Sequence, residues 1–242
     1  MKDLRVVLAA LASVLNLALP AVERHELVAH PVSTPVKGHE NIEWSTSYAF
    51  HMADEKKDLP RVLLVGDSIC NGYQAPVRKL LEGKVNVSYW VSSFCVTSDI
   101  YFDELALQLK RGKFDVVHFN NGLHTSPKRT TVSEYEAMME KALRFVRERL
   151  PQAKLIWASS TPLRKDESGW VPQLNAAGAR VAAKVPGVTT NDLFALMDPM
   201  DRGENWADKY HYKAPAVQKQ AAQVAARILE ALGKGGGDEG RL

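Results

Sequence analysis

Short apolar runs alternate with longer segments of helical periodicity along most of this chain. The clearest run, Val62 to Val65, stands between Pro60 and Gly66, as expected of a buried parallel strand. Further strands are predicted at 85–91, 114–119, 155–158 and 188–191. Helical spacing lies at 73–82, 99–111, 132–150, 171–184 and 214–232. Strands that alternate with helices form βαβ units, so the sequence predicts an α/β fold with helices on both faces of a parallel sheet.

The two ends of the chain lack this alternation. A basic start followed by an apolar run over 6–20 is typical of a secretory signal peptide and predicts export to the periplasm or the medium. The alternative is a buried N-terminal helix in a cytoplasmic protein. No other apolar stretch reaches the roughly 18–20 residues of a membrane span, so no stable membrane insertion is expected. The predicted organisation is a signal peptide or N-terminal helix at 1–22, an irregular lead-in at 23–59, one domain at 60–232 and a disordered tail at 233–242.

Charge and cysteine content narrow the classes of function. The net charge is only +3 and no long basic run occurs, so a nucleic-acid partner is not expected. Cys70 and Cys95 are too few for a disulfide scaffold and lack the spacing of a zinc site. We expect two free, semi-buried thiols, with a disulfide between them as the alternative, and no metal site.

The residues that directly follow each apolar run are the functional candidates, because ligands bind beyond the carboxyl ends of parallel strands. After the first strand, Gly66-Asp67-Ser68 places a hydroxyl at a strand-to-helix turn. The N–H groups at the start of the helix would face negative charge that develops there. The alternative interpretation of Asp67 and Ser68 is an ordinary helix cap.

Two more polar clusters are predicted at the same edge of the sheet. Asn120-Asn121-Gly122-Leu-His124 follows the third strand, where amide or imidazole N–H groups can donate to an oxyanion; a capped turn with a surface histidine is the alternative. Asp208-Lys-Tyr-His211 precedes the last helix. A serine hydroxyl needs a base such as histidine, and a carboxylate must hold that histidine in one tautomer.

In this order, the block Arg61-Val-Leu-Leu-Val-Gly-Asp-Ser-Ile69 and the block Asp208-Lys-Tyr-His211 resemble those of the SGNH (GDSL-like) hydrolase superfamily over roughly residues 60–232. The resemblance implies a three-layer α/β/α fold with a flavodoxin-like, five-stranded parallel sheet. It also implies Ser68 as nucleophile, His211 as base and Asp208 as the acid that orients the base. Such an enzyme hydrolyses esters through an acyl-enzyme and uses no metal or organic cofactor.

The middle blocks depart from the pattern of the superfamily. The second-block region, 92–98, has no glycine, and His124 stands where the third block has asparagine. The Asn-x-Gly-Leu-His sequence resembles a variant subgroup that points toward carbohydrate-active proteins. The safest oxyanion donor is the backbone N–H of Ser68. The other predicted oxyanion or substrate-binding residues are Asn120, Asn121, Gly122, His124 and Cys95, the last through a backbone N–H in its vicinity.

The resemblance favours removal of an acetyl or similar acyl group from a small-molecule or oligosaccharide ester. Four aromatic residues are predicted in or near strand-end loops, where they would stack on a sugar ring or else pack in the core: Tyr73, Trp90, Trp170 and Trp206. A lipase or thioesterase, a glycosidase with a carboxylate pair, and a non-catalytic sugar-binding protein on the same fold are the alternatives.

Overall fold

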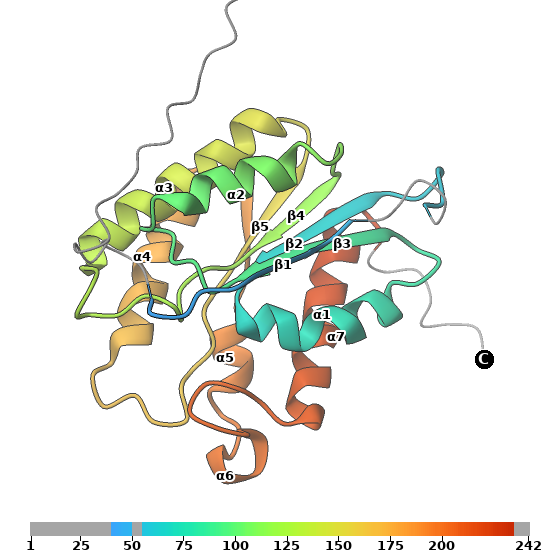
Figure 1. The fold of residues 1–242 in the computed structure, drawn as a ribbon. Helices are drawn as coiled ribbons and strands as arrows, with labels where there is room; N and C mark the ends of the chain where they lie inside the picture. The colour runs from blue at the N-terminus through green and yellow to red at the C-terminus, as the bar shows by residue number, and fades with distance from the viewer. Residues whose placement is uncertain (1–39, 50–54, 235–242) are drawn as a thin grey trace, which may run out of the picture. The chain divides into compact units, whose positions relative to one another are not determined.

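A six-stranded sheet forms the centre of the computed structural model, which describes residues 40–49 and 55–234 (Figure 1). The strand order is β1-β3-β2-β4-β5-β6. The strands are β1 (Ser45–Tyr48), β2 (Arg61–Gly66), β3 (Asn86–Ser92), β4 (Val116–Phe119), β5 (Lys154–Ala158) and β6 (Val188–Asn191). Strand β1 runs antiparallel to β3, and the other neighbours are parallel. The α/β class and the five predicted parallel strands are confirmed.

Helices cover both faces of the sheet, which gives the three layers (Figure 1). The helices are α1 (Ser68–Leu80), α2 (Ile100–Leu109), α3 (Val132–Arg149), α4 (Trp170–Lys184), α5 (Leu193–Met197), α6 (Arg202–Asn205) and α7 (Ala214–Ala231). One apolar core lies between the sheet and α2, α3 and α4. The other lies between the sheet and α1, α5 and α7.

Strand β2 explains why the first apolar run is continuous. Successive side chains of a strand point to opposite faces of the sheet. Leu63 and Val65 therefore belong to the core under α2, α3 and α4. Val62 and Leu64 belong to the core under α1 and α7. All four side chains are buried, so no polar residue can alternate with them.

Several elements differ from the prediction, among them the short helices α5 and α6, which the sequence did not predict. Residues 45–48, which the sequence analysis placed in an irregular lead-in, form the edge strand β1. Helix α1 begins at Ser68 instead of residue 73, because the Asp67 side chain caps it by accepting the N–H of Ile69. The predicted signal peptide or N-terminal helix at 1–22, and all but two residues of the predicted tail, lie outside the described residues.

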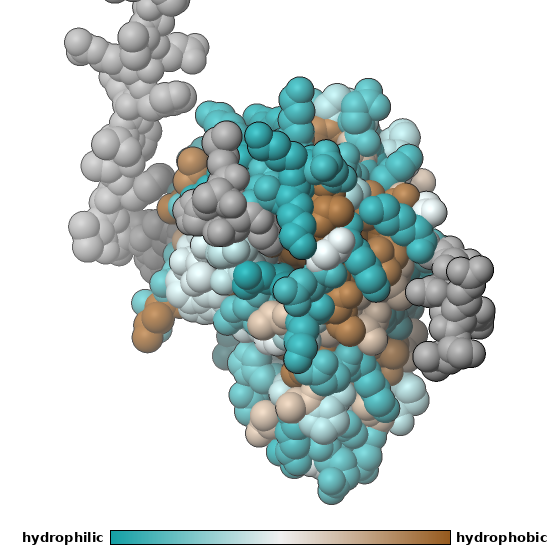
Figure 2. Space-filling model, turned by 90° about the vertical axis from the view of Figure 1, so that its right-hand side faces the viewer, coloured by the Kyte–Doolittle hydropathy of each residue, from teal (hydrophilic) through white to brown (hydrophobic). Residues whose placement is uncertain are grey.

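The face of the molecule shown in Figure 2 is largely hydrophilic. Figure 2 shows one side of the molecule, on which apolar residues are scattered among hydrophilic ones. The exposed large apolar side chains also come from separate elements, among them Ile42 before β1, Leu80 in α1 and Leu107 in α2. Within the described residues, no helix has the length and apolar character needed to cross a membrane.

Candidate active site

The turn from β2 into α1 presents Ser68 at the carboxyl edge of the sheet. Gly66 ends the strand, and a Cβ added there would collide with the Cβ of Cys70, so the tight turn requires glycine. Asp67 caps α1 through a 2.9 Å hydrogen bond from the N–H of Ile69. Because Ser68 is the first helical residue, its own N–H has no partner within the helix. That N–H is therefore available to an anionic group beside the Ser68 hydroxyl.

The loop before α7 holds Asp208 and His211 in a fixed relation. One carboxylate oxygen of Asp208 accepts the backbone N–H groups of Tyr210 at 2.7 Å and His211 at 2.8 Å. The other oxygen lies 2.8 Å from Nδ1 of His211. These hydrogen bonds lower the pKa of Asp208 to about 2, and the bond from the His211 N–H has the largest effect. Asp208 is therefore a carboxylate that can hold the imidazole with its proton on Nδ1.

The structure brings the three predicted catalytic residues into one chain of hydrogen bonds. Nε2 of His211 lies 2.9 Å from Oγ of Ser68, while Nδ1 of the same ring faces Asp208. With Nδ1 protonated, Nε2 is the acceptor for the serine proton. The arrangement can thus activate a hydroxyl nucleophile by general-base catalysis.

The amides of Asn120 and Asn121 are engaged by the backbone, and among the described residues they form no hydrogen bond with Ser68 or His211. Nδ2 of Asn120 donates to the carbonyl of Ala158 at 2.9 Å. Oδ1 of Asn121 accepts the N–H of Val96 at 3.0 Å, and its Nδ2 donates to the carbonyl of Phe94 at 2.9 Å. Asn121 therefore clamps the chain on both sides of Cys95, a role that the sequence did not reveal.

Both cysteines are free and buried, in agreement with the expectation of free thiols. Burial raises the pKa of Cys70 to about 12 and also raises that of Cys95. Sγ of Cys95 lies 3.0 Å from Oγ1 of Thr97. The backbone N–H of Cys95, in contrast, has no hydrogen-bond partner among the described residues. The part of Cys95 that remains available is therefore its N–H.

Gly122 and His124 lie in the loop after β4. A Cβ at Gly122 would collide with Oγ of Ser160, so a larger residue there would force the Ser160 side chain or the loop to shift. Nδ1 of His124 lies 3.3 Å from a carboxylate oxygen of Glu40, to which Arg129 also donates at 3.0 Å. Nε2 of His124 is buried and has no partner in the described part of the chain. Glu40 had no signal in the sequence, because its partners lie more than 80 positions away.

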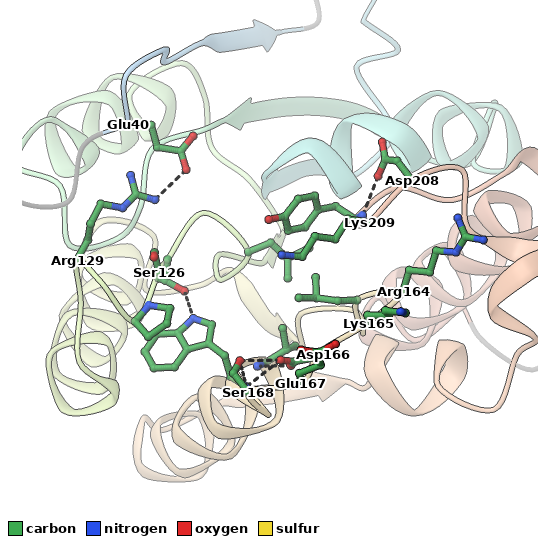
Figure 3. Close-up of a pocket in the computed structure, with 17 residues that line it drawn as sticks. Glu40, Ser126, Arg129, Arg164, Lys165, Asp166, Glu167, Ser168, Asp208 and Lys209 are labelled. Atoms are coloured by element: carbon green, nitrogen blue, oxygen red, sulfur yellow. Dashed lines mark hydrogen bonds and ion pairs between the residues drawn. The ribbon is translucent and has the colours of Figure 1, made fainter.

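A cavity of about 900 Å³ lies beside Asp208 and the loop after β4 (Figure 3). Its walls come from segments 123–129, 163–171 and 208–210 and from Glu40. Asp208 is one of the lining residues, so the cavity borders the Asp208–His211–Ser68 chain. Within the described residues, no group of three or more His, Cys, Asp or Glu side chains could hold a metal ion.

One of the four predicted aromatic residues lines this cavity. Nε1 of Trp170 donates to Oγ1 of Thr125 at 3.3 Å, which fixes the indole against the loop after β4. Tyr73, Trp90 and Trp206 are instead almost fully buried in the two cores. Tyr210, which the sequence pattern did not single out, is another lining residue and is 38% exposed.

No protein-family model and no curated protein matches the sequence. Solved structures do match. A carbohydrate esterase of family 3 from Talaromyces cellulolyticus aligns with a TM-score of 0.59 at 16% identity, over 72% of this chain and 99% of that one. A family two carbohydrate esterase from Clostridium thermocellum, solved with cellohexaose, aligns with a TM-score of 0.59 at 15% identity, over 76% and 67%.

A lipolytic protein of the G-D-S-L family from Veillonella parvula aligns with a TM-score of 0.57 at 16% identity, over 68% of this chain and 95% of that chain. At these identities it is the fold that is shared. The chain therefore has the fold of the SGNH (GDSL-type) hydrolases that its sequence resembles.

Proposed function

We propose that this protein is a serine ester hydrolase that removes an acetyl or similar acyl group from a carbohydrate through an acyl-enzyme. The observation that carries the proposal is the unbroken chain from Asp208 through His211 to Ser68, with contacts of 2.8 and 2.9 Å. A carboxylate, an imidazole and a hydroxyl in this order are the groups that acyl transfer by serine requires.

In the first half of the reaction, Oγ of Ser68 bonds to the ester carbonyl carbon and its proton moves to Nε2 of His211. The carbon–oxygen bond to the sugar then breaks, and Nε2 returns the proton to the leaving sugar oxygen. In the second half, a water molecule attacks the acyl-enzyme while Nε2 takes its proton. The acid leaves, and Oγ of Ser68 regains the proton.

The negative charge on the carbonyl oxygen needs N–H donors in both halves. Ser68 supplies one, because its N–H is unpaired at the start of α1. We assign the N–H of Cys95 as the second, because it has no partner and because Asn121 fixes the backbone on both sides of it. In this proposal Asn121 is a positioning residue. It holds the backbone at 94–96, and the Cys95 N–H takes the place of a donor at the missing second-block glycine.

The size and lining of the cavity are better suited to a carbohydrate than to a long acyl chain. A volume of about 900 Å³ exceeds what an acetyl group fills and has room for sugar units. Segment 163–168, which forms one wall, includes the charged residues Arg164, Lys165 and Glu167. Trp170 and Tyr210 add aromatic surface. The family two esterase of similar fold was itself solved with cellohexaose.

Release of acetate from acetylated xylo-oligosaccharides tests the proposal, alongside p-nitrophenyl esters from acetate to palmitate. We expect turnover of the acetyl esters, lost by about 10³-fold or more in Ser68→Ala. The exposed Ser133 of α3 provides a matched control, and Ser133→Ala should retain full turnover. Retained turnover in Ser68→Ala would contradict the proposal, and a clear preference for long chains would contradict the carbohydrate assignment.

A further inference from the structure

The cavity beside Asp208 is lined by four cationic and four anionic residues, but the two sets are not equally engaged. Three of the anions already have partners. Glu40 binds Arg129 and His124. Asp208 accepts two backbone N–H groups and faces the His211 ring.

Asp166 is the third engaged anion. Its carboxylate accepts the N–H groups of Trp170 and Val171 and the hydroxyl of Ser168. Partial burial raises the pKa of Asp166, but these hydrogen bonds outweigh that effect and leave the pKa lowered. The carboxylate oxygens of Asp166 are thus occupied by donors at the start of α4, although the negative charge remains, and Glu167 is the remaining anion of the wall.

Three cations of the cavity have no carboxylate partner among the described residues: Arg164, Lys165 and Lys209. Lys209 is the best placed of them. Its ammonium lies 5.2 Å from the centre of the Tyr210 ring. Figure 3 shows Lys209 extending into the space between the Glu40–Arg129 wall and the Asp166–Glu167 wall. The formal charges of the lining cancel, so what the cavity offers a carboxylate is three cationic groups that no carboxylate engages among the described residues.

We propose that this cavity selects a substrate whose sugar part carries a carboxylate, so that the natural substrate is an ester of a uronate-containing oligosaccharide. The inference rests on the proposed function and adds the charge of the substrate to it. A carboxylate in the cavity would accept charge-assisted hydrogen bonds from Lys209, with Arg164 and Lys165 as further cationic donors in the lining. Trp170 and Tyr210 would contact the sugar ring.

Binding to the full-length Ser68→Ala protein tests this inference without any catalytic step. Trigalacturonate and neutral cellotriose are the probes, measured by titration calorimetry at low and high salt. We expect trigalacturonate to bind about tenfold more tightly, with the difference shrinking as salt screens the exposed cations. Equal binding of the two probes, or tighter binding of cellotriose, would overturn the inference.

The role of Lys209 is tested by Lys209→Gln and Lys209→Arg in the same Ser68→Ala background. We expect Lys209→Gln to remove most of the preference for trigalacturonate, and Lys209→Arg to restore it. Lys219→Gln changes an exposed lysine of α7 outside the cavity and should keep the preference. If Lys209→Gln also keeps the preference for trigalacturonate, the assignment of the charged subsite is wrong.

The two proposals fail in distinguishable ways. Selective binding of trigalacturonate by a protein that hydrolyses no ester would support the charged cavity and overturn the hydrolase. Hydrolysis of neutral acetyl esters without any preference for the uronate would support the hydrolase and overturn the charged cavity.

Discussion

Nε2 of His211 lies 2.9 Å from Oγ of Ser68, although 143 positions separate the two residues in the chain. Ser68 is the first residue of α1, and His211 stands shortly before α7. The two helices pack against each other on one face of the sheet. The geometry of the site therefore depends on the packing of α1 on α7.

Asp208→Asn should lower kcat for an acetyl ester by about 10³- to 10⁴-fold, because an amide no longer holds the His211 ring with its proton on Nδ1. Asp208 has a pKa of about 2, so the wild-type side chain stays ionised throughout the pH range of an ordinary assay. The ratio of wild-type to variant kcat is measured at pH 8. A ratio near unity there would contradict the role assigned to Asp208.

Asn121→Ala should lower kcat by about tenfold to a hundredfold with a smaller change in KM. The substitution frees the backbone around Cys95. The Cys95 N–H, which in this proposal donates mainly in the transition state, is then misplaced. Asn120→Ala also removes a buried amide that binds backbone, and it serves as the comparison. If Asn120→Ala lowers kcat more than Asn121→Ala does, Asn120 is the direct donor and the assignment to Cys95 is wrong.

The sequence was informative where burial and local order decide the structure. Strand β2 is buried on both faces and leaves a continuous apolar run, which made the end of the strand and the position of Ser68 after it predictable. Strand β1 left no such run, since its sequence is Ser-Thr-Ser-Tyr and no residue of it is fully buried. An edge strand of this kind gains its structure by pairing with β3.

The sequence also does not show in which direction a polar side chain points. The sequence placed Asn120 and Asn121 at the end of β4, but which atoms they bind depends on Ala158 and on the 94–96 loop. Glu40 reaches His124 from a segment 84 positions away. Contacts of this range follow from the folded sheet and leave no local pattern.

Gly178→Ala and Gly72→Ala should change stability in opposite directions, although both glycines lie inside helices. A Cβ at Gly178 would collide with the indole ring of Trp157, so we expect a loss of about 1–3 kcal/mol in the free energy of unfolding. A Cβ at Gly72 meets no atom within 4 Å, so the better helix propensity of alanine should add about 0.5–1 kcal/mol. Urea unfolding at pH 7 measures both, and a stabilised Gly178→Ala would refute the packing described for α4.

His118 should make the free energy of unfolding depend on pH. Nε2 of His118 lies 3.0 Å from Nδ2 of Asn191, whose Oδ1 accepts from Gln223, so the ring is held neutral. Burial lowers the pKa of His118 from 6.5 to about 4. The unfolded chain therefore binds the proton first as pH falls, and stability that is complete above pH 6.5 is lost toward pH 4.

The loss from this group should approach about 3 kcal/mol at pH 4. It is measured by urea unfolding at pH 7 and pH 4, with His118→Gln as the non-titrating comparison. The variant should lose less stability over this range than the wild type. Equal losses in the two proteins would show that His118 does not contribute.

Covalent labelling of the full-length protein by a fluorophosphonate probe, located by mass spectrometry of its peptides, tests the central claim most directly. The account predicts a single phosphonylated site at Ser68, absent from Ser68→Ala and formed far more slowly in His211→Gln. A folded wild-type protein that remains unlabelled, or that carries the label on another residue, would contradict it.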